Sequence, residues 1–269
     1  MPEKLPPDFA TALYLSTERR GAMGDPAWYF SETGSTNDEA VKLAERGAAQ
    51  GTTVIASAQT AGRGRLGRDW YSPPGAGLYV SVVLRDPRLA SLVTLAGGVA
   101  VADGIRTATG LPVEIKWPND VVVREGRARD RRLKVAGILA EASTSSEGLQ
   151  YVILGFGINV RKSAFPPALA EVATSIEAEL GRSIEGAPVL AETLAALNAQ
   201  VTLLTTGDTP AILNRWRALA PTAMGSAIEW DQATERTRGT TAGIDDQGAL
   251  LARTGDRTER ILSGEVRWL

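Results

Sequence analysis

The chain has 269 residues, of which 43% are hydrophobic and 22% charged, and its formal net charge is −2. This composition is ordinary for a globular protein, and the charge gives no general reason to expect binding to nucleic acid. Because the sequence contains neither cysteine nor histidine, disulfides, thiolate or histidine metal sites and histidine-dependent catalysis are excluded. No apolar run reaches the length of a membrane span and no signal peptide is apparent, so we expect a cytoplasmic protein that does not bind membranes.

Residues 1–110 are predicted to alternate between strands and helices after an N-terminal extension at 1–27 that is rich in Pro and Gly. Thr36 and Glu39 have the spacing of a capping box, and Gly47 can end the helix that follows. Gly97 and Gly98 would allow a long second helix to pack closely. In chain order, the predicted elements are a helix at 9–19, a strand at 28–30, a helix at 40–46, strands at 53–58 and 78–84, and a helix at 89–109 ended by Gly110.

The remaining residues are predicted to complete a sheet and then to form a small β-rich unit. Residues 124–132 read as a charged hairpin tip, to which no role is assigned. Short strands separated by turns dominate the last fifty residues or so, which is typical of a small barrel. We therefore predict a large domain at 1–221 and an SH3-like β-barrel at 222–269. The expected elements are strands at 113–117, 121–123, 133–142 and 150–158, helices at 189–204 and 211–219, strands at 227–230, 237–244, 249–252 and 257–262, and a tight turn at 245–248.

The segment 60–70, Thr-Ala-Gly-Arg-Gly-Arg-Leu-Gly-Arg-Asp-Trp, fits neither a helical nor a strand period and is predicted to form a loop that orders around an anion. Its three glycines can adopt positive φ, approach a ligand closely and offer backbone amides to a phosphate. Its three arginines carry forked donors that suit carboxylates and phosphates. Leu66 is expected to turn inward as an apolar latch. For an isolated repeat of this kind, an arginine-rich surface loop would be the simpler interpretation.

Polar clusters also lie at the ends of several predicted strands. Lys134 is a compact charge on a strand and could bridge a carboxylate and a phosphate. Asp120 follows a proline turn and could hold Mg²⁺, which prefers oxygen ligands. Taken singly, these residues are more often a strand end and a turn residue. The clusters are Ser35-Thr-Asn37, Gln59 at the entry to the loop, Lys116-Trp-Pro-Asn-Asp120, Lys134-Val-Ala-Gly-Ile-Leu139 and Gly155-Phe-Gly-Ile-Asn159.

Taken together, these pieces resemble the biotin protein ligase family. The matching motifs are Gly-Ser-Thr-Asn, Gln-Thr-Ala-Gly-Arg-Gly-Arg-x-Gly-Arg-x-Trp, Lys-Trp-Pro-Asn-Asp, Lys-x-Ala-Gly-Ile-Leu and Gly-x-Gly-Ile-Asn, in the family's order over residues 33–160. The resemblance implies an α+β fold, with a mixed β-sheet catalytic domain packed with helices, like that of class II aminoacyl-tRNA synthetases, followed by an SH3-like barrel. It also implies the reaction, in which biotin and MgATP give biotinyl-AMP and biotin then passes to a lysine of a biotin carboxyl carrier protein.

The resemblance assigns site residues by matching position. The implied catalytic residues are Lys134, Arg63 and Arg65. The implied biotin contacts are Ser35, Thr36, Asn37, Gln59, Arg63, Gly64, Arg65, Lys134 and Gly137. The implied ATP contacts are Arg63, Arg65, Arg68, Trp70, Lys116, Asn119, Asn159 and Arg161, and the implied Mg²⁺ ligands are Asp120 and Asn119.

Two alternatives to this reaction stay open. One is a lipoate or octanoate ligase or transferase of the same fold, which the glycine-arginine loop and Lys-Trp-Pro-Asn-Asp disfavour. The other is a biotin- or nucleotide-binding protein without turnover, which Lys134 and Asp120 disfavour. A helix-turn-helix domain before Trp28 is not found, so the chain resembles the monofunctional class without specific DNA binding, as a monomer or homodimer.

Overall fold

Two β-sheets organise the part of the chain that the computed structural model describes, namely residues 1–90, 92–124, 132–146, 148–162, 165–232, 235–262, 264 and 266–269. The larger sheet has the strand order β1-β2-β3-β7-β6-β5-β4. β1 and β2 pair in parallel, and the other neighbours are antiparallel, so this sheet is mixed as predicted. Its strands are β1 (Ala27–Phe30), β2 (Thr53–Ala56), β3 (Gly77–Leu84), β4 (Glu114–Lys116), β5 (Asp120–Arg124), β6 (Arg132–Ser145) and β7 (Gly148–Asn159).

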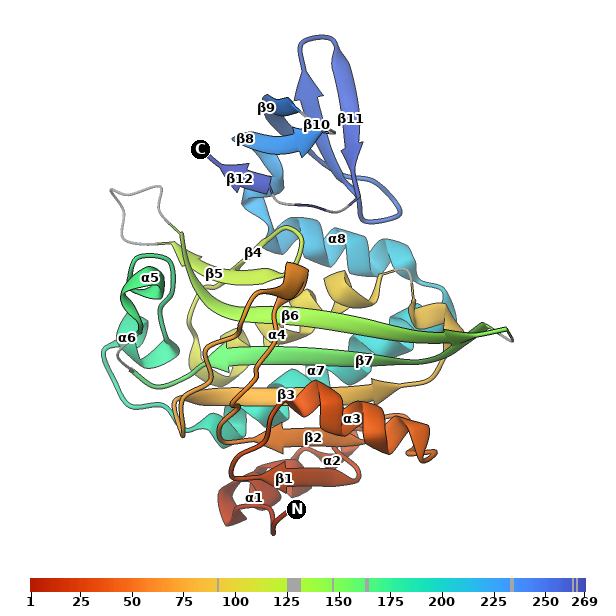
Figure 1. Ribbon diagram of the computed structural model, residues 1–269, viewed down its shortest axis with the longest axis vertical. Coiled ribbons are helices and arrows are strands. Elements are labelled where there is room, and N and C mark those ends of the chain that lie inside the picture. The colour runs from red at the N-terminus through yellow and green to blue at the C-terminus, as the bar shows by residue number, and fades with distance from the viewer. Residues whose placement is uncertain are drawn as a thin grey trace.

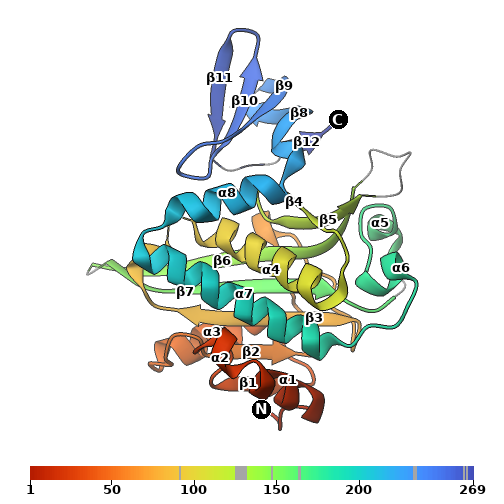
Figure 2. The same ribbon diagram turned by 180° about the vertical axis from the view of Figure 1, so that it is seen from behind.

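Alternating side chains on β3 serve two apolar clusters, one on each face of this sheet. Val80 belongs to the cluster that includes α4 (Val93–Thr109) and α7 (Gly186–Thr206), whereas Tyr79 belongs to the cluster that includes α3 (Thr36–Glu45). Successive strand residues point to opposite faces, so one short apolar sequence supports both layers. Figure 1 shows α3 in front of the sheet, and Figure 2 shows α4 and α7 across its other face.

Helix α7 is long and apolar enough to cross a membrane by length and composition, contrary to the expectation from the sequence. Of its most apolar window, 56% is buried inside the protein. A Cβ added at Gly104 of α4 would lie only 2.4 Å from the hydroxyl of Thr193 on α7. The two helices therefore cross with almost no space between them, and α7 has the packing of a core helix.

The smaller sheet has the order β11-β10-β9-β8-β12 and adjoins the large sheet next to β4. The Trp117 indole Nε1 donates to the carbonyl of Gly248 at 3.0 Å, and the Lys116 ammonium lies 5.7 Å from the centre of the Trp268 ring. These contacts join the last residues of the chain to the Lys-Trp-Pro-Asn-Asp segment. The strands are β8 (Met224–Gln232), β9 (Glu235–Ile244), β10 (Leu250–Thr254), β11 (Arg257–Ile261) and β12 (Val266–Trp268).

Most predicted elements are confirmed, with longer strands and a few corrections. Gly110 ends α4 in the left-handed region, and Gly47 has φ 84° just beyond the cap of α3. The capping box is wrong, because α3 begins at Thr36 and its N-cap, Ser35, makes no side-chain capping bond. The predicted tip at 124–132 lies outside the described residues except for its two ends. The remaining helices are α1 (Pro7–Leu15), α2 (Thr17–Arg20), α5 (Pro167–Ala170), α6 (Ile176–Leu180) and α8 (Thr209–Leu219).

Candidate active site

The glycine-arginine segment folds back on itself as a short hairpin on the α3 side of the sheet. The Gly64 amide donates to the Arg68 carbonyl at 2.7 Å, and the Trp70 amide donates to the Gly62 carbonyl at 2.8 Å. These bonds correct one prediction, because the Gly64 amide is used within the hairpin rather than offered to a phosphate. The hairpin returns the chain to Trp70, which lines the pocket described below.

Positive φ is confined to the tip of this hairpin. Gly67 has φ 71° and Leu66 has φ 58°, whereas Gly62 and Gly64 do not adopt this conformation. Leu66 is 66% exposed, so the predicted inward latch is wrong. Gly62 is required for a different reason, because a Cβ there would lie 2.6 Å from the Trp70 carbonyl oxygen. The glycines thus close the hairpin tightly and turn its tip.

A β-bulge places Lys134 in the pocket. Asp120 pairs with Gly137 and Val121 with Ala136, but Val122 pairs with Lys134, which leaves Val135 as the extra residue. Side chains along a strand alternate between the two faces of the sheet. One extra residue therefore shifts the side chains that precede it in the strand to the opposite face. Lys134 therefore shares the pocket face with Gly137 and Leu139 although its position in the sequence is even and theirs are odd.

Three glycines on the two central strands leave room for the larger side chains of the pocket. A Cβ at Gly157 would lie 2.3 Å from the Trp70 indole nitrogen, and one at Gly137 would lie 2.9 Å from the same ring. A Cβ at Gly155 would lie 2.3 Å from the Asn37 amide oxygen. Each of these distances is far below van der Waals contact, so glycine is needed for close approach at these positions.

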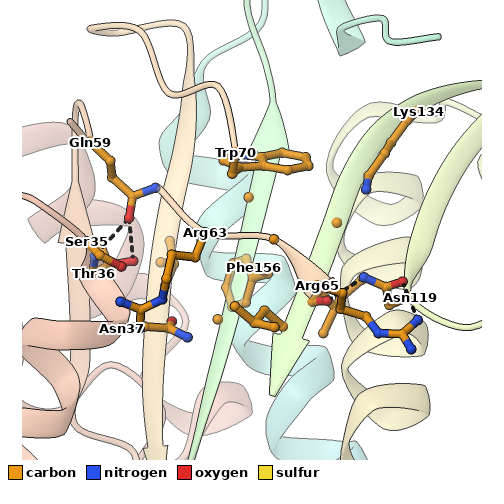
Figure 3. Close-up of a pocket in the computed structure, with 17 residues that line it drawn as sticks. Ser35, Thr36, Asn37, Gln59, Arg63, Arg65, Trp70, Asn119, Lys134 and Phe156 are labelled. Atoms are coloured by element: carbon orange, nitrogen blue, oxygen red, sulfur yellow. Dashed lines mark hydrogen bonds between the residues drawn. The ribbon is translucent and has the colours of Figure 1, made fainter. Parts of the chain in front are cut away.

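One end of the pocket consists of hydroxyl and amide groups (Figure 3). The Gln59 amide oxygen accepts hydrogen bonds from the Thr36 backbone amide at 2.8 Å and from its hydroxyl at 3.1 Å. The buried Ser81 hydroxyl lies 2.8 Å from the Thr36 hydroxyl and 2.5 Å from the Asn37 amide oxygen. Ser35 completes this end, whose hydroxyl and amide groups are held by a buried hydrogen-bond network.

The other end of the pocket is cationic. Lys134 lies 2.5 Å from the Asp120 carboxylate and 5.0 Å from the centre of the Trp70 ring. Arg65 donates to the Asn119 amide oxygen at 3.3 Å, and burial lowers the pKa of its guanidinium. Nearby, burial also lowers the pKa of Lys116, which the Asp120 carboxylate partly offsets. Cations that are partly removed from water here would gain most from meeting an anionic ligand.

Arg63 lines the pocket, but its guanidinium is held by carboxylates. It donates to Asp38 at 2.5 Å and to Glu141 at 3.0 Å. Burial works against its charge, yet the hydrogen bonds to both acids outweigh this and raise the pKa of Arg63. Arg63 and Arg65 therefore have different contacts in the structure, although the resemblance assigns both to catalysis and to binding of biotin and ATP.

The structure brings most of the predicted site residues together around one pocket. The residues that line it are Ser35, Thr36, Asn37, Gln59, Arg63, Gly64, Arg65, Trp70, Val80, Asn119, Lys134, Gly137, Ile138, Leu139, Gly155, Phe156 and Gly157. Leu139 pairs with Gly155 and provides an apolar side chain on the pocket face, whereas Val80 and Phe156 border the pocket from strands whose side chains at these positions pack in the cluster on the opposite face.

Five of the predicted nucleotide or metal residues lie outside this lining. Asp120 borders it through its ion pair with Lys134, and Lys116 lies behind that pair. Asn159 is 9% exposed and donates to the Thr174 carbonyl at 3.0 Å, a contact that fixes the chain after β7. Arg161 lines a different hollow, with Asp8 and Tyr29 among its neighbours. Arg68 is also outside the lining and forms the closing pair of the hairpin through its carbonyl.

Asp38, Ser81 and Glu141 were missed by sequence reasoning. Asp38 stands directly after the Ser-Thr-Asn cluster and Glu141 lies on the same strand face as Gly137, so the position of each carried a usable signal. Ser81 carried a different signal, because it is a single hydroxyl within the apolar run of β3. A buried polar side chain requires a partner, and the network above supplies it.

The fold and the pocket define a class of protein that binds a small molecule between a hydrogen-bonding end and a cationic end on a mixed sheet. Residues 29–159 match the biotin/lipoate A/B protein ligase family, and residues 232–267 match the biotin protein ligase C-terminal domain. The chain belongs to the biotin protein ligase family.

Curated relatives and solved structures agree with this assignment. The chain is 36% identical to the biotin–[acetyl-CoA-carboxylase] ligase of Paracoccus denitrificans, over 88% of this chain and 98% of that protein. It is 34% identical to the bifunctional ligase/repressor BirA of Bacillus subtilis, over 94% of this chain and 76% of that protein. The Aquifex aeolicus biotin protein ligase in complex with biotin and ATP superposes with a TM-score of 0.76 at 27% identity, over 90% of this chain and 99% of that one.

Proposed function

We infer that the protein is an ATP-dependent biotin ligase, which activates biotin as biotinyl-5′-AMP and transfers it to a lysine of a carrier protein. The observation that carries this is the division of one pocket into an end rich in hydroxyl and amide groups and an end with Lys134 and Arg65 (Figure 3). Biotin has the same division, with a neutral ureido ring at one end and a carboxylate at the other. Named ligases among the relatives and a relative's complex with biotin and ATP support the same reaction.

The chemistry requires two anions to meet. A biotin carboxylate oxygen forms a bond to the α-phosphorus of ATP, and the bond to the leaving pyrophosphate breaks. Lys134 and Arg65 lie where the two anions would come together, and fixed cations in a partly buried site offset their repulsion. In the second half-reaction, the carrier's lysine amine attacks the biotinyl carbonyl and AMP leaves.

Magnesium fits the site only as an ion that enters with ATP. Among the residues described, no cluster of three or more Asp, Glu, His or Cys side chains could hold a metal by itself. Mg²⁺ in nucleotide sites commonly takes one or two carboxylates plus substrate phosphates, so Asp120 alone suits it. Asn119 is engaged twice, by Arg65 and by the Ile138 carbonyl, so we assign it to positioning Arg65 instead of binding metal. The ion would neutralise phosphate charge.

The test is pyrophosphate release with biotin and ATP, followed by the same assay on Lys134→Ala. Removing a transition-state cation should raise the activation free energy by about 2–4 kcal/mol, which lowers the rate by roughly two to three orders of magnitude. Lys42→Ala is the matched control, because Lys42 is exposed and pairs with Glu39 in its turn of α3. Near-normal release by Lys134→Ala would refute its role, and release with lipoate instead of biotin would favour a lipoate ligase.

Four further properties stay predictions: a biotin carboxyl carrier protein as acceptor, absence of specific DNA binding, a monomeric or homodimeric state, and a cytoplasmic location without membrane binding. The relative's name supports an acetyl-CoA carboxylase subunit as the source of the acceptor lysine.

A further inference from the structure

Arg63 lines the pocket, but its two carboxylate contacts disagree with an anion-binding role. Its guanidinium donates to Asp38 on α3 and to Glu141 on β6, while its backbone belongs to the hairpin at 60–70. Three separate segments of the chain thus meet at one side chain. Two carboxylates already compensate its single charge, which leaves little electrostatic advantage for a substrate anion there.

Glu141, one of the two carboxylates in this cluster, is itself held by a second hydrogen bond. The same Glu141 oxygen that accepts from Arg63 also accepts from the Asn37 amide at 2.5 Å. Asn37 is 5% exposed, is bonded to Ser81, and occupies the space left by Gly155. A chain of hydrogen bonds therefore runs from the buried Ser81 at the centre of the sheet to the partly exposed guanidinium.

The position of the cluster gives it a function. Arg63 and Gly64 line the pocket, and their backbone leads from Gln59 at the hydroxyl and amide end to Arg65 at the cationic end. An anchored Arg63 side chain holds this backbone over the pocket, whereas the hairpin tip beyond it is exposed at Leu66.

We propose that Asp38 and Glu141 are positioning residues that act through Arg63, and that the three form an ion-pair latch that keeps residues 60–64 closed over bound biotin. The inference rests on the proposed function. It assigns Arg63 to retention of the ligand and leaves recognition of the carboxylate and phosphates to Arg65 and Lys134.

The latch predicts an effect that does not depend on the ligand's charge. Asp38→Asn and Glu141→Gln should each increase the dissociation rate of biotin about two- to fivefold, as expected for partly exposed ion pairs. The uncharged analogue biotinol, in which a hydroxyl replaces the carboxylate, should show the same increase. Arg63→Gln should increase the dissociation rates of biotin and biotinol at least as much. In the double variant, Asp38→Asn should have no additional effect once Arg63 has been replaced.

Dissociation of biotin and biotinol would be followed by stopped flow, with Glu39→Gln as the matched control. Glu39 neighbours Asp38 on α3 but pairs with Lys42, so its removal changes the charge of the helix without touching Arg63. An effect on biotin but not on biotinol would overturn the latch and make Arg63 an anion contact. Unchanged dissociation in both acidic variants would overturn it as well. A parent protein that binds neither ligand would instead refute the proposed function.

Discussion

Adding one methyl group at Gly157 tests whether the pocket depends on the close approach of Trp70 to the sheet. A Cβ at this position would lie 2.3 Å from the indole Nε1 and 2.4 Å from the adjacent ring carbon. Carbon and nitrogen atoms in contact are ordinarily about 3.5 Å apart or more, so the ring must move by roughly an ångström. Trp70 is flanked by Gly137 and by the Lys134 ammonium, and any shift therefore disturbs the cationic end.

Overpacking of this kind costs about 1–3 kcal/mol. Trp70 belongs to a hairpin and not to the buried core, so we expect most of this cost to appear as displacement of the hairpin rather than as global unfolding. Gly157→Ala should thus weaken biotin binding about tenfold, equivalent to ~1.4 kcal/mol, with only a small change in the free energy of unfolding. Calorimetric titration with biotin and chemical denaturation measure the two quantities.

Gly98→Ala provides the control, because a Cβ there would meet Ile115 at an ordinary 3.7 Å. It adds the same methyl group on α4 and should leave biotin affinity unchanged, with a stability gain of up to about 1 kcal/mol from helix propensity. Unaltered biotin affinity in Gly157→Ala would refute the argument that this glycine makes room for the indole.

Three further outcomes are expected. Arg65→Gly should remove a cation from the adenylate and loosen the hairpin, so that biotinyl-AMP escapes and labels an added lysine-rich bystander protein more than the parent does, as a biotin blot would show. Hydrogen bonds from the backbone amides of Ile184 and Lys162 lower the pKa of the Glu177 carboxyl below its ordinary 4.5. The ionised carboxylate therefore contributes its full stabilisation of the fold above pH 4.5, and this contribution is lost as the pH falls through the lowered pKa. Glu177→Gln should therefore lower the free energy of unfolding by about 0.5–1 kcal/mol at pH 7. On acidification, the melting temperature of the variant should fall less steeply than that of the parent, and an identical pH dependence would contradict the assignment. Gel shifts with biotin and ATP should detect no sequence-specific DNA complex, in keeping with the net charge of −2, and a salt-resistant specific shift would contradict this.

The order and type of the main elements could be predicted because each is encoded locally. Apolar runs such as Leu78–Leu84 predict buried strands, and Gly110 marks the end of α4. Short pieces without a strong pattern, such as β12 and α6, escaped prediction. The helix start at Thr36 was mispredicted because Thr36 bonds to Gln59, 23 residues away, and a capping pattern carries no information on such a partner.

The site shows the same division between local and long-range information. Ordered motifs identified most of the pocket lining, since their residue types are specific and their spacing is visible. The contacts of Arg63 could not be predicted, because its partners Asp38 and Glu141 lie 25 and 78 residues away in the sequence, on α3 and β6. Leu66 was placed inward on its apolar character alone, but its left-handed backbone at the tip of the turn directs it to solvent.

The cation–π contact between Lys116 and Trp268 has a practical consequence for labelling the protein. Trp268 precedes Leu269, so any tag fused after Leu269 begins next to a ring that covers a lysine of the Lys-Trp-Pro-Asn-Asp turn. The N-terminus lies at the opposite end of the molecule, beside β1 (Figure 1). Purification handles, fluorophores and surface tethers therefore belong at Met1, where the attached mass leaves the small sheet and the contact between Lys116 and Trp268 undisturbed.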